Sequence, residues 1–279
     1  MLSQRIISEQ QLKQLTAAGY AFAILDPCMV SETIKKAEEA GQERAVSLFN
    51  QTPLEEYFTL APYVFRADEA LLEWIPKQNS VLVFAKVSLQ ELAAHLQFFL
   101  MAALPDRRRW YFRFYDPRIL KAYLPSCDLS ELSRFYGPIR AFGFHQEENI
   151  HVFEREATGE TVSVHDGQLW TIRPEQYNLF AQLATVDFLD RMARHLAQKF
   201  SSAVKELGPE RTRQWVHSGI DRARAYNLTS EQQIGVYLDL IFTFGFDFDQ
   251  RQPWAVLILN DPELNAETKA LRLQGFIVE

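Results

Sequence analysis

The chain has 279 residues, long enough to bury a full hydrophobic core in one large domain or two smaller ones. It is 47% hydrophobic and 23% charged, which is typical of globular proteins, and its net charge of −7 disfavours a nucleic-acid-binding protein. Its sequence contains neither the apolar core of a secretory signal nor a run of about 18 apolar residues. We therefore expect a cytoplasmic protein that does not insert into a membrane.

The first elements in chain order are short apolar runs that alternate with amphipathic segments. Residues 20–25 and 81–87 are expected to be buried strands, since they are apolar over a strand length and are bounded by turn residues. Residues 88–103 carry apolar side chains at helical spacing after a capping Ser88, which predicts a helix. Cys28 and Cys127 are too few for a disulfide framework, so we expect both to be reduced and packed.

The aromatic-rich residues 110–115 are predicted to be a central strand. Large rings occupy both of its alternating faces, and such strands usually lie between two covering layers. Asp116 is a predicted helix N-cap and Pro117 the first helical residue. Proline is favoured there because the N–H of the first helical residue has no partner within the helix. Further on, the turn at Thr158 and Gly159 predicts a β-hairpin over residues 149–166.

From Pro174 the pattern becomes helical. Apolar residues recur at helical spacing over 175–207, where Gly208 and Pro209 should end the helix. Shorter helices are expected at 210–226, 231–244, 254–259 and 266–273. The prediction is an α+β protein, with a mixed domain over residues 1–170 that has a central sheet flanked by helices, followed by a helical lobe over residues 171–279.

Motifs for catalysis, metal binding or cofactor binding are scarce. The sequence contains no glycine-rich phosphate loop, no GxSxG and no HExxH, so we expect no cofactor and no metal. Asp247 and Asp249 could share one face, but a hard cation needs about six oxygen ligands. The best catalytic candidates are Arg113 and Asp116, but an arginine in a strand beside a helix N-terminus is more often part of a structural ion pair or a capping contact. An enzyme is therefore not the favoured interpretation.

Aromatic residues cluster near the end of the chain. Phe246, Phe248 and Trp254 follow the predicted helix over 231–244, and they could either pack in a core or form an exposed adhesive patch. We take these three side chains as the predicted contact surface for a protein partner.

Five sequence segments resemble a known family, the adaptors or effector chaperones of bacterial type VI secretion, called Tap or TEC proteins. The segments read YAFAILD at residues 20–26, SLFNQTPLEE at 47–56, SLQELAAHLQFFL at 88–100, FRFYDPR at 112–118 and YGPI at 136–139. The resemblance covers roughly residues 18–142, and Tyr136 stands where Phe is commoner in the family. Residues 222–249 are more loosely similar to the helical tail of many members.

The resemblance implies a non-enzymatic cytoplasmic adaptor that binds an effector toxin and helps to load it onto the VgrG spike protein. It supplies no catalytic residues, and it implies that the family motif is the structural centre of the fold. The motif residues are Phe112, Arg113, Phe114, Tyr115, Asp116, Pro117, Arg118, Gly137 and Pro138. Two alternatives remain: an enzyme with a site around Arg113, Tyr115 and Asp116, and a structural subunit of a larger assembly.

Overall fold

The structure is a computed structural model that describes residues 2–146, 149–155 and 169–277. The chain forms two compact units, unit 1 (Met1–Ala181) and unit 2 (Gln182–Glu279). The predicted division was at residue 170, whereas the helix α7 (Pro174–Lys199) begins in unit 1 and ends in unit 2. The fold is α+β, as the sequence predicts.

Unit 1 is built on a seven-stranded sheet in which every neighbouring pair is antiparallel, with the order β1-β9-β8-β5-β2-β4-β3. Its strands are β1 (Leu2–Ile7), β2 (Ala21–Leu25), β3 (Ala45–Ser47), β4 (Tyr63–Arg66), β5 (Ser80–Ala85), β8 (Ile139–Gln146) and β9 (Asn149–Arg155). The two predicted strands at 20–25 and 81–87 are therefore β2 and β5, and every residue of both is buried. Strands of this kind need cover on both faces.

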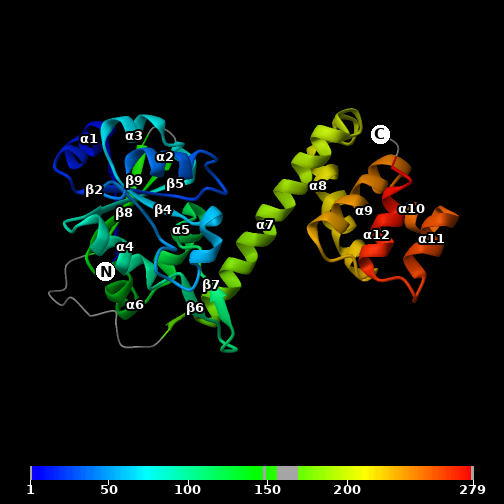
Figure 1. Ribbon diagram of the computed structural model, residues 1–279. Coiled ribbons are helices and arrows are strands. Elements are labelled where there is room, and N and C mark those ends of the chain that lie inside the picture. The colour runs from blue at the N-terminus through cyan, green and yellow to red at the C-terminus, as the bar shows by residue number, and fades with distance from the viewer. Residues whose placement is uncertain (1, 147–148, 156–168, 278–279) are drawn as a thin grey trace. The chain divides into compact units, whose positions relative to one another are not determined.

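Helices supply that cover on both sides of the sheet (Figure 1). The helical elements of unit 1 are α1 (Glu9–Ala17), α2 (Thr33–Ala40), η1 (Glu55–Leu60), α3 (Glu69–Trp74), η2 (Lys77–Asn79), α4 (Leu89–Gln97), α5 (Pro117–Ser126) and α6 (Leu129–Tyr136). On one face, Leu12 of α1 and Ala37 of α2 pack with Phe65, Leu82 and Val152 of the strands. The helices α4, α5 and α6 lie on the opposite side of the sheet in Figure 1.

The prediction of a central strand over 110–115 is wrong. β7 (Arg109–Tyr111) is the edge of a small second sheet with β6 (Met101–Ala103) and β10 (Trp170–Thr171), in the order β10-β6-β7. The rings of Phe112 and Phe114 are fully buried, but they pack in an aromatic cluster with Phe135 instead of standing on a pleated surface. The predicted helix over 88–103 is also too long, since residues Met101–Ala103 pair as a strand with β7.

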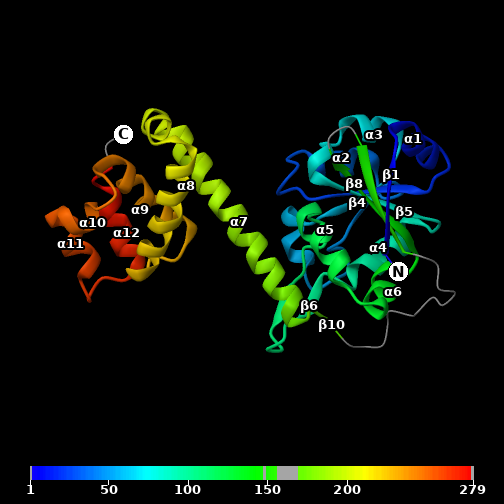
Figure 2. The same ribbon diagram turned by 180° about the vertical axis from the view of Figure 1, so that it is seen from behind.

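The predicted hairpin over 149–166 is replaced by different pairings. Its first arm is β9, which pairs with β8 along one edge and with β1 along the other, so both of its edges are occupied. Figure 2 shows β1 beside these strands. The expected turn and second arm lie outside the described residues.

Unit 2 is helical. After the end of α7 it contains α8 (Ser201–Ala225), α9 (Glu231–Phe244), α10 (Phe248–Arg251), α11 (Pro253–Asn260) and α12 (Ala266–Gln274). The long predicted helix ends before Phe200, whose φ of −121° and ψ of 45° are not helical. Gly208, the predicted end, is instead a kink inside α8 with φ +74°. The core packs Leu196, Val216, Ile220, Tyr237 and Leu240 together.

Among the helices in the described residues, none combines the length and the apolar composition that crossing a bilayer requires.

Candidate functional site

A groove of about 640 Å³ runs along the edge strand β3 of unit 1. This volume lies within the range of about 300–1,000 Å³ that is common for ligand sites. Its walls come from α2, α4, β3, β4, η1 and the loop between β3 and η1. All three residues of β3 line it, although successive side chains of a strand point to opposite faces. The groove must therefore follow the free edge of the strand, with α2 and α4 beside it.

The backbone of β3 faces this groove with part of its hydrogen-bonding capacity unused. In the antiparallel pairing of β3 with β4, every second residue of β3 is hydrogen-bonded to its partner. Leu48 N donates to Pro62 O and Arg66 N donates to Arg44 O, both at 2.8 Å, so Val46, opposite Val64, is the hydrogen-bonded residue between them. The polar groups of Ala45 and Ser47 consequently face away from β4. In the described residues, the Ala45 carbonyl oxygen and the Ser47 amide have no hydrogen-bond partner.

Most side chains around the groove, apart from Ser47 and the rings of Phe49, Phe58 and Tyr63, fall into three classes. Small apolar residues are Ala37, Ala45, Val46, Ala93 and Ala94; amides are Gln42, Asn50, Gln51, Gln90 and Gln97; carboxylates are Glu38 and Glu55. The lining residues, all within the described part of the chain, include neither Lys nor Arg. The site can therefore accept small aliphatic groups, hydrogen-bond to peptide groups and attract positive charge.

The loop over residues 48–54 fixes one wall of the groove. Phe49 is buried and packs edge-on against Tyr111, with ring centroids 5.7 Å apart. Thr52 Oγ1 donates to the Phe49 carbonyl at 2.7 Å, and the side chain of Gln97 donates to the Asn50 carbonyl at 2.8 Å. Gln51 has φ +57°, a left-handed conformation that turns the chain. These contacts hold the wall in place without any bound ligand.

The short helix η1 places apolar side chains at the surface next to the groove. Phe58 lines the groove and is 62% exposed, while Tyr57 and Leu60 are 51% and 52% exposed. Exposed rings grouped beside a groove are a common feature of sites that bind other proteins. Sequence reasoning did not single out these side chains, because their exposure depends on how η1 packs against the rest of unit 1.

The side chains of Arg113 and Asp116, the predicted catalytic residues, bind other partners and not each other. The guanidinium of Arg113 donates to Asp26 Oδ2 at 2.6 Å, and Asp26 also accepts from the backbone amide of Cys28 at 2.9 Å. Asp26 is buried, whereas the Arg113 side chain is 39% exposed. Asp116 is buried and accepts from the Arg118 amide at 2.9 Å and from the Arg118 guanidinium at 2.7 Å. Asp116 is thus the N-cap of α5, as predicted, and Pro117 its first residue.

The tyrosines of this region are not poised to act as bases. The hydroxyls of Tyr111 and Tyr115 lie 2.9 Å apart. Burial raises the pKa of Tyr115 to about 12 and the pKa of Tyr111 well above its ordinary value. Both hydroxyls therefore stay protonated near neutral pH.

The remaining motif residues have structural positions. Phe112 and Phe114 are buried, and Gly137 ends α6 with φ +47°, a conformation that L side chains rarely adopt. A Cβ atom on Gly137 would lie 2.3 Å from the ring of His95, so glycine is required there. Pro138 follows as the link to β8 and is half-buried.

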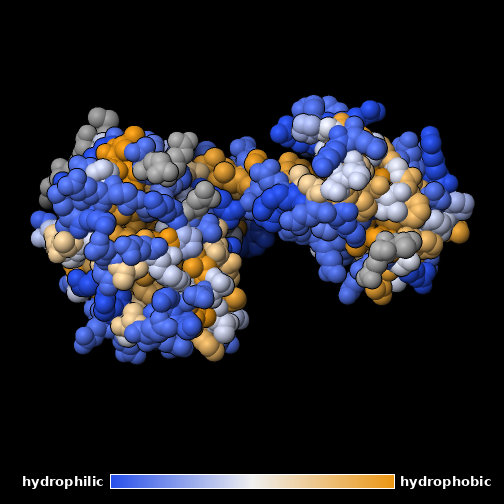
Figure 3. All heavy atoms as spheres, turned by 90° about the horizontal axis from the view of Figure 1, so that it is seen from above, coloured by the Kyte–Doolittle hydropathy of each residue, from blue (hydrophilic) through white to orange (hydrophobic). Residues whose placement is uncertain are grey.

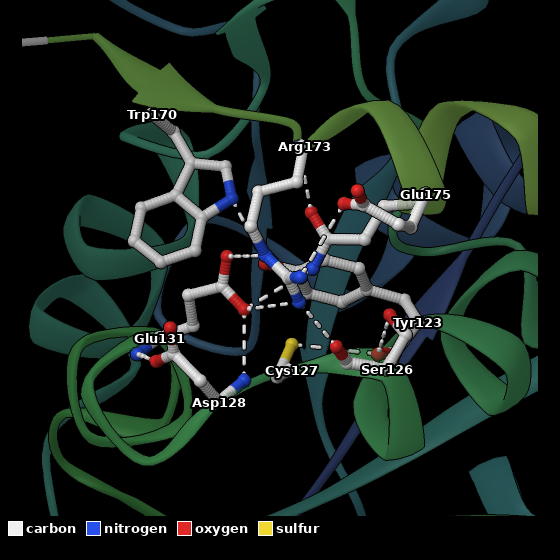
Figure 4. Close-up of polar contacts among 9 residues, drawn as sticks. Tyr123, Ser126, Cys127, Asp128, Glu131, Trp170, Arg173 and Glu175 are labelled. Carbon is white, nitrogen blue, oxygen red and sulfur yellow. Dashed lines mark hydrogen bonds and ion pairs between the residues drawn. The ribbon is translucent and has the colours of Figure 1, made fainter.

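A polar cluster around Arg173 joins the end of the small sheet to α6 (Figure 4). The Arg173 guanidinium donates to both carboxylate oxygens of Glu131, at 2.8 and 3.1 Å, and to the Ser126 carbonyl. The Trp170 indole donates to the Tyr123 hydroxyl at 2.9 Å. Burial raises the pKa of the Cys127 thiol to about 12, which makes it a poor nucleophile. Sequence reasoning missed this cluster, and we regard it as structural.

The predicted contact surface on unit 2 is only partly available. Phe248 is buried in the core, which removes it as a contact residue. Phe246 is half-buried beneath the guanidinium of Arg222, and Trp254 is half-buried and stacked on Phe276 with ring centroids 4.0 Å apart. The face of unit 2 drawn in Figure 3 mixes hydrophobic and hydrophilic residues.

Asp249 has a structural role instead of a metal-binding one. Its buried carboxylate pairs with the Arg222 guanidinium and accepts from the hydroxyls of Tyr226 and Tyr237, at 3.2 and 2.8 Å. Across the described ranges of the chain, no group of three or more His, Cys, Asp or Glu side chains is arranged to hold a metal ion.

The profile of a family described as a domain of unknown function, DUF4123, matches residues 21–134. This match lies inside the range of 18–142 over which we noted a resemblance, and it contains the groove and residues 112–118. No curated protein and no solved structure matches the chain.

Proposed function

We propose that the protein is a non-catalytic cytoplasmic adaptor that binds a type VI secretion effector toxin and promotes its loading onto the VgrG spike. The observation that carries the proposal is the match to DUF4123, a domain of unknown function, over residues 21–134, the same part of the chain in which we noted the resemblance to the type VI adaptors. Three of the five sequence segments quoted above fall wholly in this range, the first begins one residue before it, and the last, at 136–139, lies outside it.

The geometry is compatible with a binding protein. Residues 47–56, one of the family-like segments, form a wall of the groove and carry exposed or half-buried side chains, including Asn50, Gln51 and Glu55. Residues 112–118 instead supply buried rings and a helix cap. A domain in which one segment is buried in the core and another lines an open groove is suited to binding a partner.

Co-purification tests the proposal. The full-length protein, carrying an affinity tag, is co-expressed with the toxin and the VgrG encoded beside its gene. We expect it to retain the toxin in a stable complex, and we expect VgrG to join when all three proteins are present. A folded adaptor that retains neither protein would contradict the proposal.

The alternative is an enzyme that uses Arg113, Tyr115 and Asp116. One observation favours it, the partial exposure of Arg113 beside the buried Asp26. Replacing Arg113 with Lys separates the two functions, because lysine keeps the charge but loses the planar guanidinium. An adaptor should still bind its effector after this change.

A further inference from the structure

We propose that the groove along β3 binds an extended, basic peptide segment of the cargo protein, which adds to the free edge of the sheet as a short strand. This inference rests on the proposed adaptor function, and it names the site and the chemistry of the segment that the adaptor holds.

The free edge of β3 is the first argument. The Ala45 carbonyl and the Ser47 amide face the groove, one as an acceptor and one as a donor, on alternate residues of the same edge. An extended chain can hydrogen-bond to such a pair, as in other complexes where a peptide is added to a sheet edge. A second folded domain could not reach a strand that lies between α2 and α4 as easily as a single extended segment can.

The lining of the groove limits the side chains that the segment can carry. Ala37, Ala93 and Ala94 leave room beside the strand for small aliphatic side chains. The five amides can hydrogen-bond to peptide groups of the segment that do not face β3. Phe58 gives the segment an exposed ring to pack against.

Charge complementarity selects a basic segment. Glu38 and Glu55 come from two different elements, α2 and η1, and both side chains are exposed at the groove. Since no lining residue is Lys or Arg, their charges are not offset within the groove. An acidic segment would be repelled, and a Lys or Arg side chain in the segment would be attracted.

The test uses a phage library of random ten-residue peptides, selected on the full-length protein. We expect the recovered peptides to be basic and rich in small aliphatic residues. Ala94→Trp places a large ring in the groove from an exposed helix position, and it should weaken binding of these peptides by about tenfold or more. Ala17→Trp makes the same change on exposed α1 away from the groove and should leave binding unchanged.

The double variant Glu38→Gln with Glu55→Gln tests the charge. It should weaken binding by about tenfold and reduce the preference for basic peptides. Its matched control is Glu39→Gln with Glu56→Gln, which changes the neighbouring carboxylates of the same two elements outside the groove lining. Circular dichroism and thermal unfolding verify that all four variants are folded.

Three results would overturn the inference. The first is a selection that recovers no peptide with a preference for the wild-type protein over Ala94→Trp. The second is equal binding of the recovered peptides to the variant that lacks the Glu38 and Glu55 carboxylates and to its control. A wild-type dimer that Ala94→Trp converts to a monomer in sedimentation would instead assign the groove to a second copy of the chain. The adaptor function is judged separately, because a protein that retains its effector equally well with Ala94→Trp remains an adaptor and loses only this site.

Discussion

Two segments of unit 1, residues 47–56 and residues 112–118, both belong to the matched family range, yet the structure uses them in opposite ways. The segment 112–118 is largely internal: its two phenylalanines are fully buried, and Asp116 is fixed at the start of α5. The segment 47–56 is anchored by buried Leu48 and Phe49 and otherwise turns polar side chains toward an open groove. A distinctive sequence motif can therefore identify a fold without marking the surface that performs the function.

The largest expected effect concerns stability. Phe112→Ala removes a ring that packs against Phe114, Tyr123 and Phe180, and it should lower the free energy of unfolding by about 3–5 kcal/mol. Phe58→Ala removes a ring of the same size from an exposed position and should change the stability by less than about 0.5 kcal/mol. Urea unfolding followed by near-ultraviolet circular dichroism measures both. Equal losses would contradict the contrast between the two segments.

Much of the fold could be predicted from local pattern, and the failures have physical causes. Ser88 and Asp116 are the N-caps that the sequence suggested, because capping depends on residues close in sequence. The aromatic residues 110–115 were misplaced, since alternation cannot distinguish a pleated strand from an irregular segment that enters a ring cluster. The partners of β9 could not be predicted either, because β1 comes from the far end of unit 1.

The candidate site was harder to predict than the fold. The groove joins residues of α2, β3, η1 and α4, and no local pattern indicates that these elements meet at a sheet edge. Asp26 was overlooked as the partner of Arg113 because the two residues are distant in sequence. Asp116, adjacent to Arg113 in the motif, was the obvious candidate, but its carboxylate is committed to the first turn of α5.

The next expected effect tests whether Arg113 is structural. Arg113→Ala leaves the buried Asp26 carboxylate without its cation, which should cost about 1–3 kcal/mol, less than for a fully buried pair because the arginine is partly exposed. In an Asp26→Asn background, Arg113→Ala should lower the stability by less. Urea unfolding of the wild type, the two single variants and the double variant gives the coupling free energy between the two side chains. If Arg113→Ala has no effect on stability in either background, the ion pair is not structural.

The reactivity of the two thiols, Cys28 and Cys127, compares an exposed with a buried position of unit 1. Burial raises the pKa of Cys28 and, more strongly, the pKa of Cys127, to about 12. Near neutral pH, iodoacetamide should alkylate Cys127 more than about 100-fold more slowly in the folded protein than in the urea-unfolded protein. The prediction that Cys28 is packed is wrong, since its side chain is exposed, and Cys28 should therefore be alkylated first. Mass spectrometry measures both rates, and equal labelling of the two thiols in the folded protein would contradict the burial of Cys127.

The smallest expected effect is a pH dependence. Burial of His145 in β8 lowers its pKa, so the unfolded chain takes up a proton at a higher pH than the folded chain does. The neutral histidine therefore supports stability fully above its unfolded pKa of about 6.5, and this support declines as the pH falls through the folded pKa. His145→Gln should flatten the fall in stability between neutral and mildly acidic pH. Identical pH profiles for His145→Gln and wild type would contradict this assignment.

Hydrogen–deuterium exchange on the complex of the full-length protein with its co-purified effector tests the central claim most directly. We expect the effector to slow exchange at residues 45–58, including the Ser47 amide, and to leave exchange at the buried residues 112–118 unchanged. Protection that appears elsewhere in the chain, with residues 45–58 exchanging as fast as in the free protein, would contradict it.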